Sequence, residues 1–219
     1  MKVFSPGSVF LCAVLLLLSA VPVFSHPHMF IDTEVTFEFD RDELKGFWIK
    51  WYFDVMFTAS IRLDYDYDRD GVFDSAEVSD IEQGAFQNLR AYHYFTRVIR
   101  DDGVDRVEEV DGFSARMEDD RLVYRFFVPY TCPLSAETCN LSLIIFDETF
   151  FCDIMYMKDS PVHIEGTEYA AADARIRANR DFMIEYDPTG GQGRSQGSEA
   201  PPASGRAFPY ELLLSYRKK

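Results

Sequence analysis

The sequence predicts an α+β fold, a single antiparallel, strand-rich domain of the sandwich type with an inserted EF-hand-like helix–loop–helix. Three observations predict it. Apolar and polar residues alternate in several short segments, turn residues separate these segments, and one helical stretch contains an acidic loop. The hydrophobic content of 47%, with 16% aromatic residues, suits a packed core in a chain of 219 residues.

The first 25 residues are typical of a secretory signal peptide. Lys2 gives a positive start, and a continuous apolar run covers residues 9–21. This run is short for a membrane span, although an uncleaved anchor is the alternative. We expect cleavage after Ser25, which would make His26 the N-terminus and place the protein in the periplasm or outside the cell.

The mature chain begins with a predicted hairpin. Residues 30–39 alternate between apolar and polar side chains, as in a strand with one buried face, and residues 44–52 form a second strand after a turn. The pattern then changes to helical spacing. We expect an insertion at residues 55–92, with helices over 55–63 and 75–92.

Residues 66–77, between these helices, match a calcium-binding loop. Such a loop needs oxygen ligands at positions 1, 3, 5, 7, 9 and 12 and a glycine at position 6. Gly71 supplies the turn and Phe73 an apolar anchor. The ligand positions hold Asp66, Asp68, Asp70, Val72 through its carbonyl, Asp74 through a water, and Glu77. The alternative is an acidic surface turn before a helix, in which glycine, apolar residue and distal glutamate would coincide by chance.

The remainder of residues 26–186 returns mainly to strands, and a flexible linker and a tail follow it. We expect strands over 94–100, 112–117, 122–129, 141–146, 150–157 and 162–164, a helix over 173–182, a linker over 187–206 and an apolar, basic tail over 207–219. Residues 141–146 and 150–157 are expected to pair with each other. The tail could dock on the sheet or stay free for a partner or a membrane.

Three cysteines follow the predicted signal peptide, and an exported protein is expected to meet oxidising conditions. Cys132 and Cys139 could form a disulfide that closes a short loop between two strands. Cys152 would then be a buried thiol or would pair with another chain.

His26 and His28 form a second candidate metal site at the new N-terminus. A free amine and imidazoles suit zinc, nickel, cobalt or copper rather than calcium. Asp54 and Asp147 could reach the same ion. The alternatives are incidental histidines at an exposed terminus, a helix N-cap for Asp54 and a turn carboxylate for Asp147.

The formal net charge of −15 disfavours binding to nucleic acid or to anionic lipid and suits a protein that handles cations. We find no nucleophile motif and no phosphate-binding loop, so we do not expect an enzyme.

Several segments in order resemble the bacterial periplasmic domain-of-unknown-function 1007 family. They are the histidine pair after the leader, Phe30-Ile-Asp32, Trp51-Tyr-Phe-Asp54, the aspartates of the loop, Tyr94–Val98, Phe146–Phe151 and Asp159–Val162. The resemblance implies a periplasmic component of an ABC-type transport system that is linked to nickel, cobalt or zinc transport. Glu148 stands where the family often has proline.

The leading hypothesis is a periplasmic metal-binding accessory protein, with structural calcium in the loop and a transition metal at His26 and His28. A membrane metal transporter is its expected partner, and membrane contact would come only through the tail. A calcium-dependent adaptor without a transition metal is the alternative. A copper enzyme with a terminal histidine is the third reading.

Overall fold

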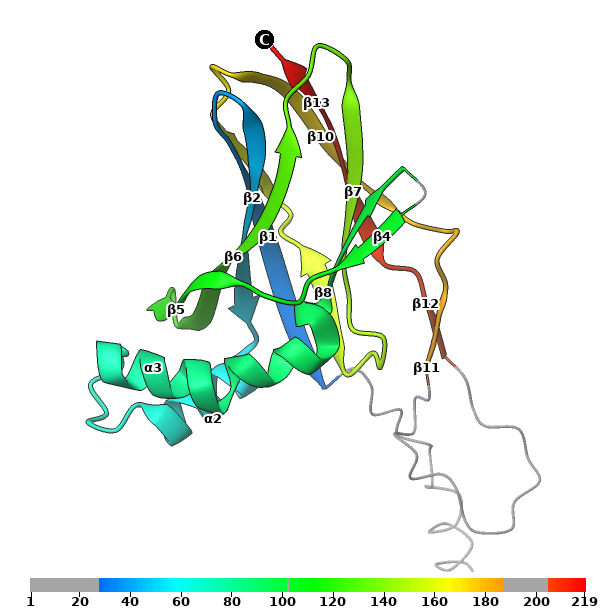
Figure 1. Cartoon of the computed structure of the whole chain (residues 1–219). Helices are drawn as coiled ribbons and strands as arrows, with labels where there is room; N and C mark the ends of the chain where they lie inside the picture. The colour runs from blue at the N-terminus through cyan, green and yellow to red at the C-terminus, as the bar shows by residue number, and fades with distance from the viewer. Residues whose placement is uncertain (1–27, 102, 187–204) are drawn as a thin grey trace, which may run out of the picture.

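A computed structural model describes residues 28–101, 103–186 and 205–219. Two β-sheets dominate it, and three short helices lie together at one end of the sheets (Figure 1). Within the described ranges, every helix is too short or too polar to cross a membrane. The predicted signal peptide and His26 lie outside the described residues, as does most of the predicted linker.

The first sheet has six strands, of which five follow the order β5-β6-β2-β1-β8, and β9 also pairs with β1. The pairs are antiparallel except β1 with β8 and β1 with β9. Its strands are β1 (Met29–Phe39), β2 (Glu43–Phe53), β5 (Asp111–Glu118), β6 (Arg121–Pro133), β8 (Cys152–Tyr156) and β9 (Val162–Glu165).

The second sheet is antiparallel throughout, in the order β10-β13-β7-β3-β4. A separate two-stranded ribbon joins β11 to β12. These strands are β3 (Thr96–Arg100), β4 (Gly103–Arg106), β7 (Cys139–Ile145), β10 (Ala170–Ala178), β11 (Ile184–Tyr186), β12 (Gly205–Ala207) and β13 (Tyr210–Lys218).

The main core lies between the two sheets. Alternate residues of β1 are buried, so Val35 and Phe37 have no exposed surface, and they lie opposite Ile49 and Phe47 of β2. The predicted hairpin is therefore confirmed. Phe39 of the first sheet meets Tyr216 of the second, with 5.2 Å between ring centroids, and both belong to the same buried cluster. The strand-rich, mainly antiparallel fold follows from this burial of one face of each sheet.

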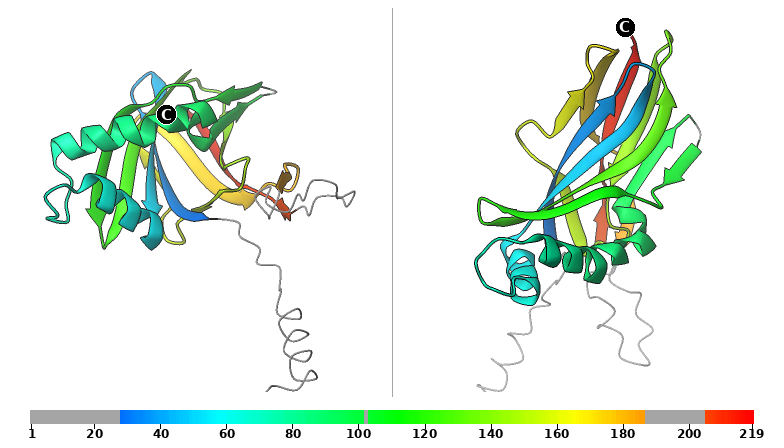
Figure 2. Two further views of the ribbon diagram at one scale, coloured as in Figure 1. Left: turned by 90° about the horizontal axis from the view of Figure 1, so that it is seen from below. Right: turned by 60° about the vertical axis from the view of Figure 1, so that its left-hand side comes forward.

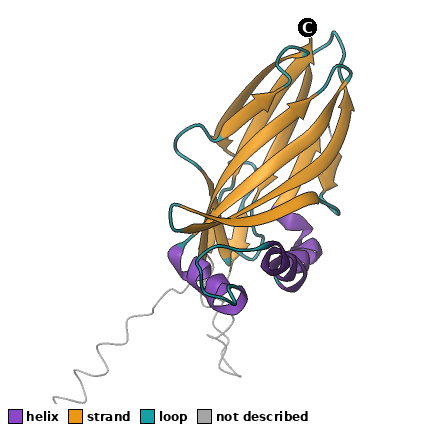
Figure 3. Cartoon of the chain, turned by 90° about the vertical axis from the view of Figure 1, so that its left-hand side faces the viewer, coloured by secondary structure: helices purple, strands orange, loops and turns teal. Residues whose placement is uncertain are grey.

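The helical segment forms α2 (Val55–Tyr65), α3 (Ser75–Gly84) and the 3-10 helix η1 (Phe86–Phe95). They cover one end of the sheets, as the two views of Figure 2 and the colouring of Figure 3 show. The expected helix over 75–92 instead breaks after Gly84. The chain continues from Phe86 as the 3-10 helix η1, and both Ile81 of α3 and Phe86 of η1 are fully buried.

Two secondary-structure predictions are wrong. Residues 173–182 were expected to be helical, but Ala170–Ala178 form β10, because pairing with β13 outweighs the helix propensity of its alanines and arginines. Residues 141–146 and 150–157 were expected to pair, yet β7 and β8 belong to different sheets.

Two alternatives were open for residues 207–219, and in the structure this segment docks on the second sheet. β13 is an inner strand between β10 and β7, and Leu212 and Leu214 on it are fully buried. The end of the chain therefore belongs to the fold and is not a free tail.

The predicted disulfide is not formed: Cys132, Cys139 and Cys152 are free thiols. The two candidates lie on strands of different sheets, β6 and β7. Cys132 Sγ accepts a hydrogen bond of 3.1 Å from Arg100 Nη1, whereas Cys139 Sγ lies 4.0 Å from Ser135 Oγ. The loop between them connects two sheets and not two paired strands.

Candidate metal centre

The acidic loop connects the end of α2 to the start of α3. Asp66 is the C-cap of α2, and Asp74 is the N-cap of α3. Asp74 Oδ1 accepts from the backbone N–H groups of Ala76 at 2.7 Å and Glu77 at 2.9 Å. The aspartate side chain therefore caps the helix that follows the loop, whereas at the other end the backbone N–H of Asp66 donates to Arg62 O at 3.1 Å.

Three aspartates of this loop converge. The side chains of Asp66, Asp68 and Asp70 each place a potential metal-binding oxygen within 4.8 Å of the others. This is the one such group in the described part of the chain. These are the first three positions of the sequence motif. The structure therefore brings together half of the predicted calcium ligands.

Asp66 is buried, with only 6% of its surface exposed. Its Oδ2 accepts from Gly71 N at 3.2 Å and lies 3.6 Å from Arg62 Nε. Its Oδ1 is buried and has no hydrogen-bond partner among the described residues. A buried carboxylate oxygen without a partner is costly, because its lost hydration is not replaced.

Short local bonds set the direction of the other two carboxylates. Asp68 Oδ1 accepts from Asp70 N at 3.1 Å, and Asp70 Oδ1 accepts from Val72 N at 2.8 Å. Each carboxylate keeps a second oxygen for another ligand. Gly71 has a φ of 88°, the left-handed conformation for which glycine was predicted at position 6.

Glu77 does not join the three aspartates. It is only 4% exposed, and both of its oxygens accept backbone N–H groups: Oε1 from Tyr67 at 2.7 Å and Oε2 from Asp74 at 2.9 Å. It therefore ties the first residues of the loop to the N-terminus of α3. Val72 is 57% exposed, so its carbonyl belongs to an open part of the loop.

Of the residues predicted for the transition metal, the structure describes His28, Asp54 and Asp147, and these three form no ligand cluster. His28 donates its backbone N–H to Phe151 O at 2.9 Å, and its ring lies 5.0 Å from the ring of Phe151. Asp54 is the N-cap of α2, bonded to Met56 N and Phe57 N. Its other oxygen accepts from Phe30 N at 2.8 Å. The N-cap alternative for Asp54 therefore describes its role in the structure.

Asp147 is 4% exposed and behaves as a turn carboxylate. Its Oδ1 accepts from the backbone N–H and the hydroxyl of Thr149, at 2.9 and 2.7 Å, and Oδ2 accepts from Cys152 N at 3.0 Å. Burial raises the pKa of the Cys152 thiol to about 12, and the nearby carboxylates of Asp147 and Asp54 add to this. Cys152 is thus a buried, protonated thiol, which was one of the two alternatives for it.

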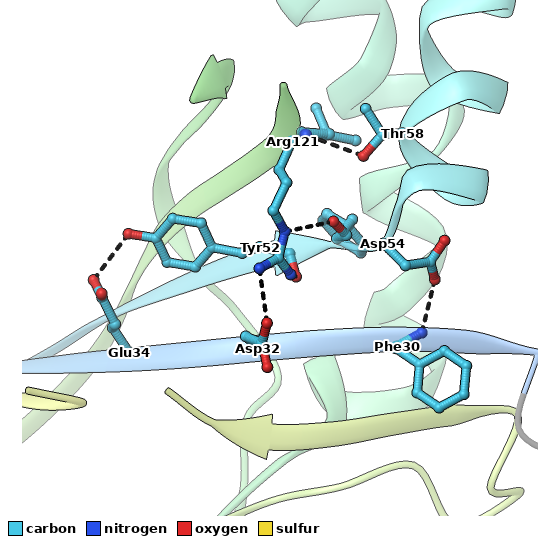
Figure 4. Close-up of polar contacts among 9 residues, drawn as sticks. Phe30, Asp32, Glu34, Tyr52, Asp54, Thr58 and Arg121 are labelled. Atoms are coloured by element: carbon cyan, nitrogen blue, oxygen red, sulfur yellow. Dashed lines mark hydrogen bonds and ion pairs between the residues drawn. The ribbon is translucent and has the colours of Figure 1, made fainter. Parts of the chain in front are cut away.

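Sequence reasoning missed Arg121, which organises the polar contacts beside Asp54 (Figure 4). Its guanidinium donates to the carbonyls of Phe53 at 2.9 Å and Tyr52 at 2.6 Å, and to Asp32 Oδ2 at 2.7 Å. Arg121 lies 89 residues from Asp32 in the sequence, so no local pattern could have linked them. The bonds fasten the end of β2 to β1 and to the start of β6.

A family model described as "Protein of unknown function (DUF1007)" matches residues 11–214. An uncharacterised 15.5 kDa protein encoded in the trpE 3′ region of Spirochaeta aurantia is 33% identical over 117 residues, which cover 53% of this chain and 83% of that protein. An uncharacterised protein of Haemophilus influenzae is 24% identical over 165 residues, 74% of this chain and 78% of that protein.

Proposed function

Because the chain belongs to the DUF1007 family, whose function is unknown, we propose a function from its own geometry: it is an exported protein that binds one calcium ion in the loop 66–77. The calcium ion orders the helical end of the domain. The same protein handles a transition metal at its N-terminus as an accessory to a membrane metal transporter.

One observation carries the calcium proposal. Asp66 Oδ1 is buried without a partner, and Asp66, Asp68 and Asp70 each place a carboxylate oxygen within 4.8 Å of the others. A hard cation would replace the missing interaction and would offset the repulsion among three carboxylates. Oxygen ligands in this number and spacing favour calcium over softer metals.

The remaining ligands follow from the motif. Val72 would contribute its carbonyl, Asp74 would act through a water, and Glu77 would close the site with its carboxylate. Glu77 now accepts from Tyr67 N and Asp74 N, so its entry into the ligand set requires it to share or release these bonds. Calcium binding would therefore change the contacts that join α2 to α3.

Calorimetric titration of calcium into the protein tests the proposal. We expect one site per chain, and Asp66→Asn should weaken it by at least tenfold. Asp64→Asn is the matched control. Asp64 is an exposed residue of α2, two positions before the loop, and its substitution removes the same charge. Equal affinities for the two variants would refute a site at the loop.

The transition-metal role rests on where His28 lies. Its backbone bond to Phe151 and its ring contact with that residue hold it next to the segment that carries Asp147 and Cys152. Asp54 binds Phe30 N, two residues beyond His28. Nitrogen ligands at this point suit zinc, nickel, cobalt or copper.

Titration of the mature protein with each of these four metals tests this role. Replacing His26 and His28 with alanine should abolish the tightest binding and leave calcium affinity unchanged. Unchanged transition-metal affinity would instead favour a calcium-dependent adaptor. N-terminal sequencing of the exported protein tests whether His26 is the first residue.

A further inference from the structure

Two arginines lie directly opposite each other at an edge of the second sheet. Arg97 of β3 pairs in register with Arg106 of β4, the edge strand labelled in Figure 1. Opposite residues of an antiparallel pair carry their side chains on the same face, with Cβ atoms about 5 Å apart, and like charges at such positions repel. The pair therefore favours an anion beside it.

Aromatic rings hold the Arg97 side chain in place. Its guanidinium carbon lies 4.8 Å from the ring centroid of Phe146 and 5.6 Å from that of Phe182. The side chain is 15% exposed, and burial lowers the pKa of Arg97, to which the charge of Arg106 adds. A guanidinium that has lost much of its hydration in this way gains from a carboxylate partner.

Glu148 supplies one such carboxylate. It forms an ion pair with Arg97 Nη2, although the Glu148 side chain is 61% exposed. Arg106 forms no ion pair with any described residue. A carboxylate on an exposed side chain can thus reach the Arg97 guanidinium from the solvent side, while the second positive charge stays unpaired.

A pocket of 210 Å³ lies at this contact. Arg97, Arg106 and Glu148 contribute to its wall, and Tyr92 and Phe95 add aromatic surface. The volume is below the about 300–1,000 Å³ of sites for drug-sized ligands, so the pocket suits a smaller molecule.

The other carboxylate of the pocket wall already has partners. Asp147 Oδ1 accepts from the backbone and hydroxyl of Thr149, and Oδ2 accepts from Cys152 N. These bonds fix Asp147 in its turn. Glu148 is therefore the carboxylate of the described wall that a ligand can replace.

A strained turn fixes the aromatic side of the pocket. His93, Tyr94 and Phe95 all have positive φ angles, of 54°, 49° and 54°. Tyr94 is buried against Phe86, with 5.3 Å between ring centroids, and this packing holds the turn in a conformation that is costly for residues other than glycine. His93 and Phe95, on either side of Tyr94, lie in the pocket wall.

We propose that the Arg97–Arg106 pair and the pocket beside it bind a small organic carboxylate, which displaces Glu148. The planar guanidinium of Arg97 donates two parallel N–H···O bonds to the carboxylate, and Arg106 adds the second positive charge. Tyr92 and Phe95 contact the apolar body of the ligand. Glu148 is then a tethered competitor. This site is separate from the calcium loop and does not depend on it.

Benzoate and benzamide test the selection, because they share a planar shape and differ in charge. In ¹H–¹⁵N spectra of the mature protein, benzoate should shift the amide signals of Arg97 and Arg106 along a saturable curve, whereas benzamide should not. Metal-free buffer prevents benzoate from binding through an ion in the loop 66–77. Equal curves for the two probes would overturn the proposal, as would the absence of a saturable benzoate shift in both the unchanged protein and Glu148→Gln.

Glu148→Gln tests the displacement. Without the competing carboxylate, benzoate should bind about 2- to 5-fold tighter, as the loss of one exposed ion pair predicts. Glu137→Gln is the matched control, because it removes the same charge from an exposed residue between β6 and β7 and should leave the affinity unchanged. Equal benzoate affinities for Glu148→Gln and the unchanged protein would identify an ordinary ion pair and refute the displacement.

Two arginine variants test the receptor. Arg97→Lys keeps the charge but loses the planar fork, and it should weaken benzoate about tenfold or more, as for a hydrogen bond between charged groups. Arg106→Gln should weaken it about 2- to 5-fold, whereas Arg41→Gln, at an exposed position between β1 and β2, should change little. If Arg97→Lys does not fold, Arg106→Gln decides: an unchanged benzoate affinity refutes a site made by the two arginines.

Discussion

Replacing Glu77 with glutamine tests two roles of this residue separately: its hydrogen bonds within the loop and its proposed role as a calcium ligand. In the structure its two carboxylate oxygens accept from Tyr67 N and Asp74 N at 2.7 and 2.9 Å, and the side chain is 4% exposed. Glutamine keeps one oxygen and directs an amide N–H₂ at the other donor. One backbone N–H therefore loses its bond to a charged acceptor.

The expected cost without calcium is about 1.5–3 kcal/mol, the range for a hydrogen bond to a charged group. At about 2–4 °C per kcal/mol for a domain of this size, the melting temperature should fall by about 3–12 °C in chelator. Calcium at a hundred times its dissociation constant should stabilise the unchanged protein by a further ~2.7 kcal/mol. Glu77→Gln should lose most of this second gain, because it also removes a ligand charge.

Thermal unfolding followed by circular dichroism, in calcium and in chelator, measures both effects. Glu82→Gln on the same helix is the control and should leave both melting temperatures within about 1–2 °C of the starting values, as expected for a surface change. Equal melting temperatures for Glu77→Gln and the unchanged protein in chelator would refute the structural role. A full calcium gain in Glu77→Gln would refute its role as a ligand.

Three further predictions concern the rest of the fold. Leu214→Ala on β13 should cost about 2–5 kcal/mol in urea unfolding and Leu213→Ala clearly less, because Leu214 is 0% exposed and its neighbour lies on the other face; equal losses would contradict an inner strand. Asp54→Ala should cost about 0.5–2 kcal/mol through the lost N-cap of α2, and Asp54→Asn should restore most of it, which the same assay checks. Burial raises the pKa of Cys152 from 9.0 to about 12, so its stabilising effect is complete below pH 9 and is lost as the pH rises towards 12. Alkylation by iodoacetamide at pH 8 should therefore modify Cys139 much faster than Cys152, and equal rates would contradict the buried thiol.

The sequence predicted the elements whose pattern is local. The β1–β2 hairpin follows from strict alternation, because Val35 and Phe37 must face the core and a shift by one residue would expose them. The spacing of acidic residues likewise predicted the loop, and the structure brings the oxygens of Asp66, Asp68 and Asp70 together.

Elements that depend on distant partners were harder to predict. β10 has the composition of a helix but forms a strand because it pairs with β13. The expected linker lies between these two strands in the sequence. β8 pairs in parallel with β1, more than a hundred residues earlier, so its neighbour β7 was the wrong partner to infer. Propensity and proximity in sequence carry no information about such pairs.

The same reason explains the polar contacts near the N-terminus. Asp54 and Asp147 were candidate ligands by residue type alone, but their oxygens accept from Phe30 N and Cys152 N on strands that the fold brings close. Arg121 had no local motif and yet bonds to Asp32 and to two carbonyls of β2. Whether a carboxylate binds a metal or accepts backbone hydrogen bonds thus depends on which N–H groups the fold places beside it. A sequence pattern does not show these neighbours.

The amide resonance of Gly71 tests the calcium site most directly. This N–H donates to Asp66 Oδ2 at 3.2 Å, on the same carboxylate whose Oδ1 has no partner among the described residues. In ¹H–¹⁵N spectra recorded during a calcium titration, the Gly71 signal should shift and saturate at one equivalent of calcium per chain. A Gly71 signal that does not move in millimolar calcium, while the protein stays folded, would contradict a calcium site in this loop.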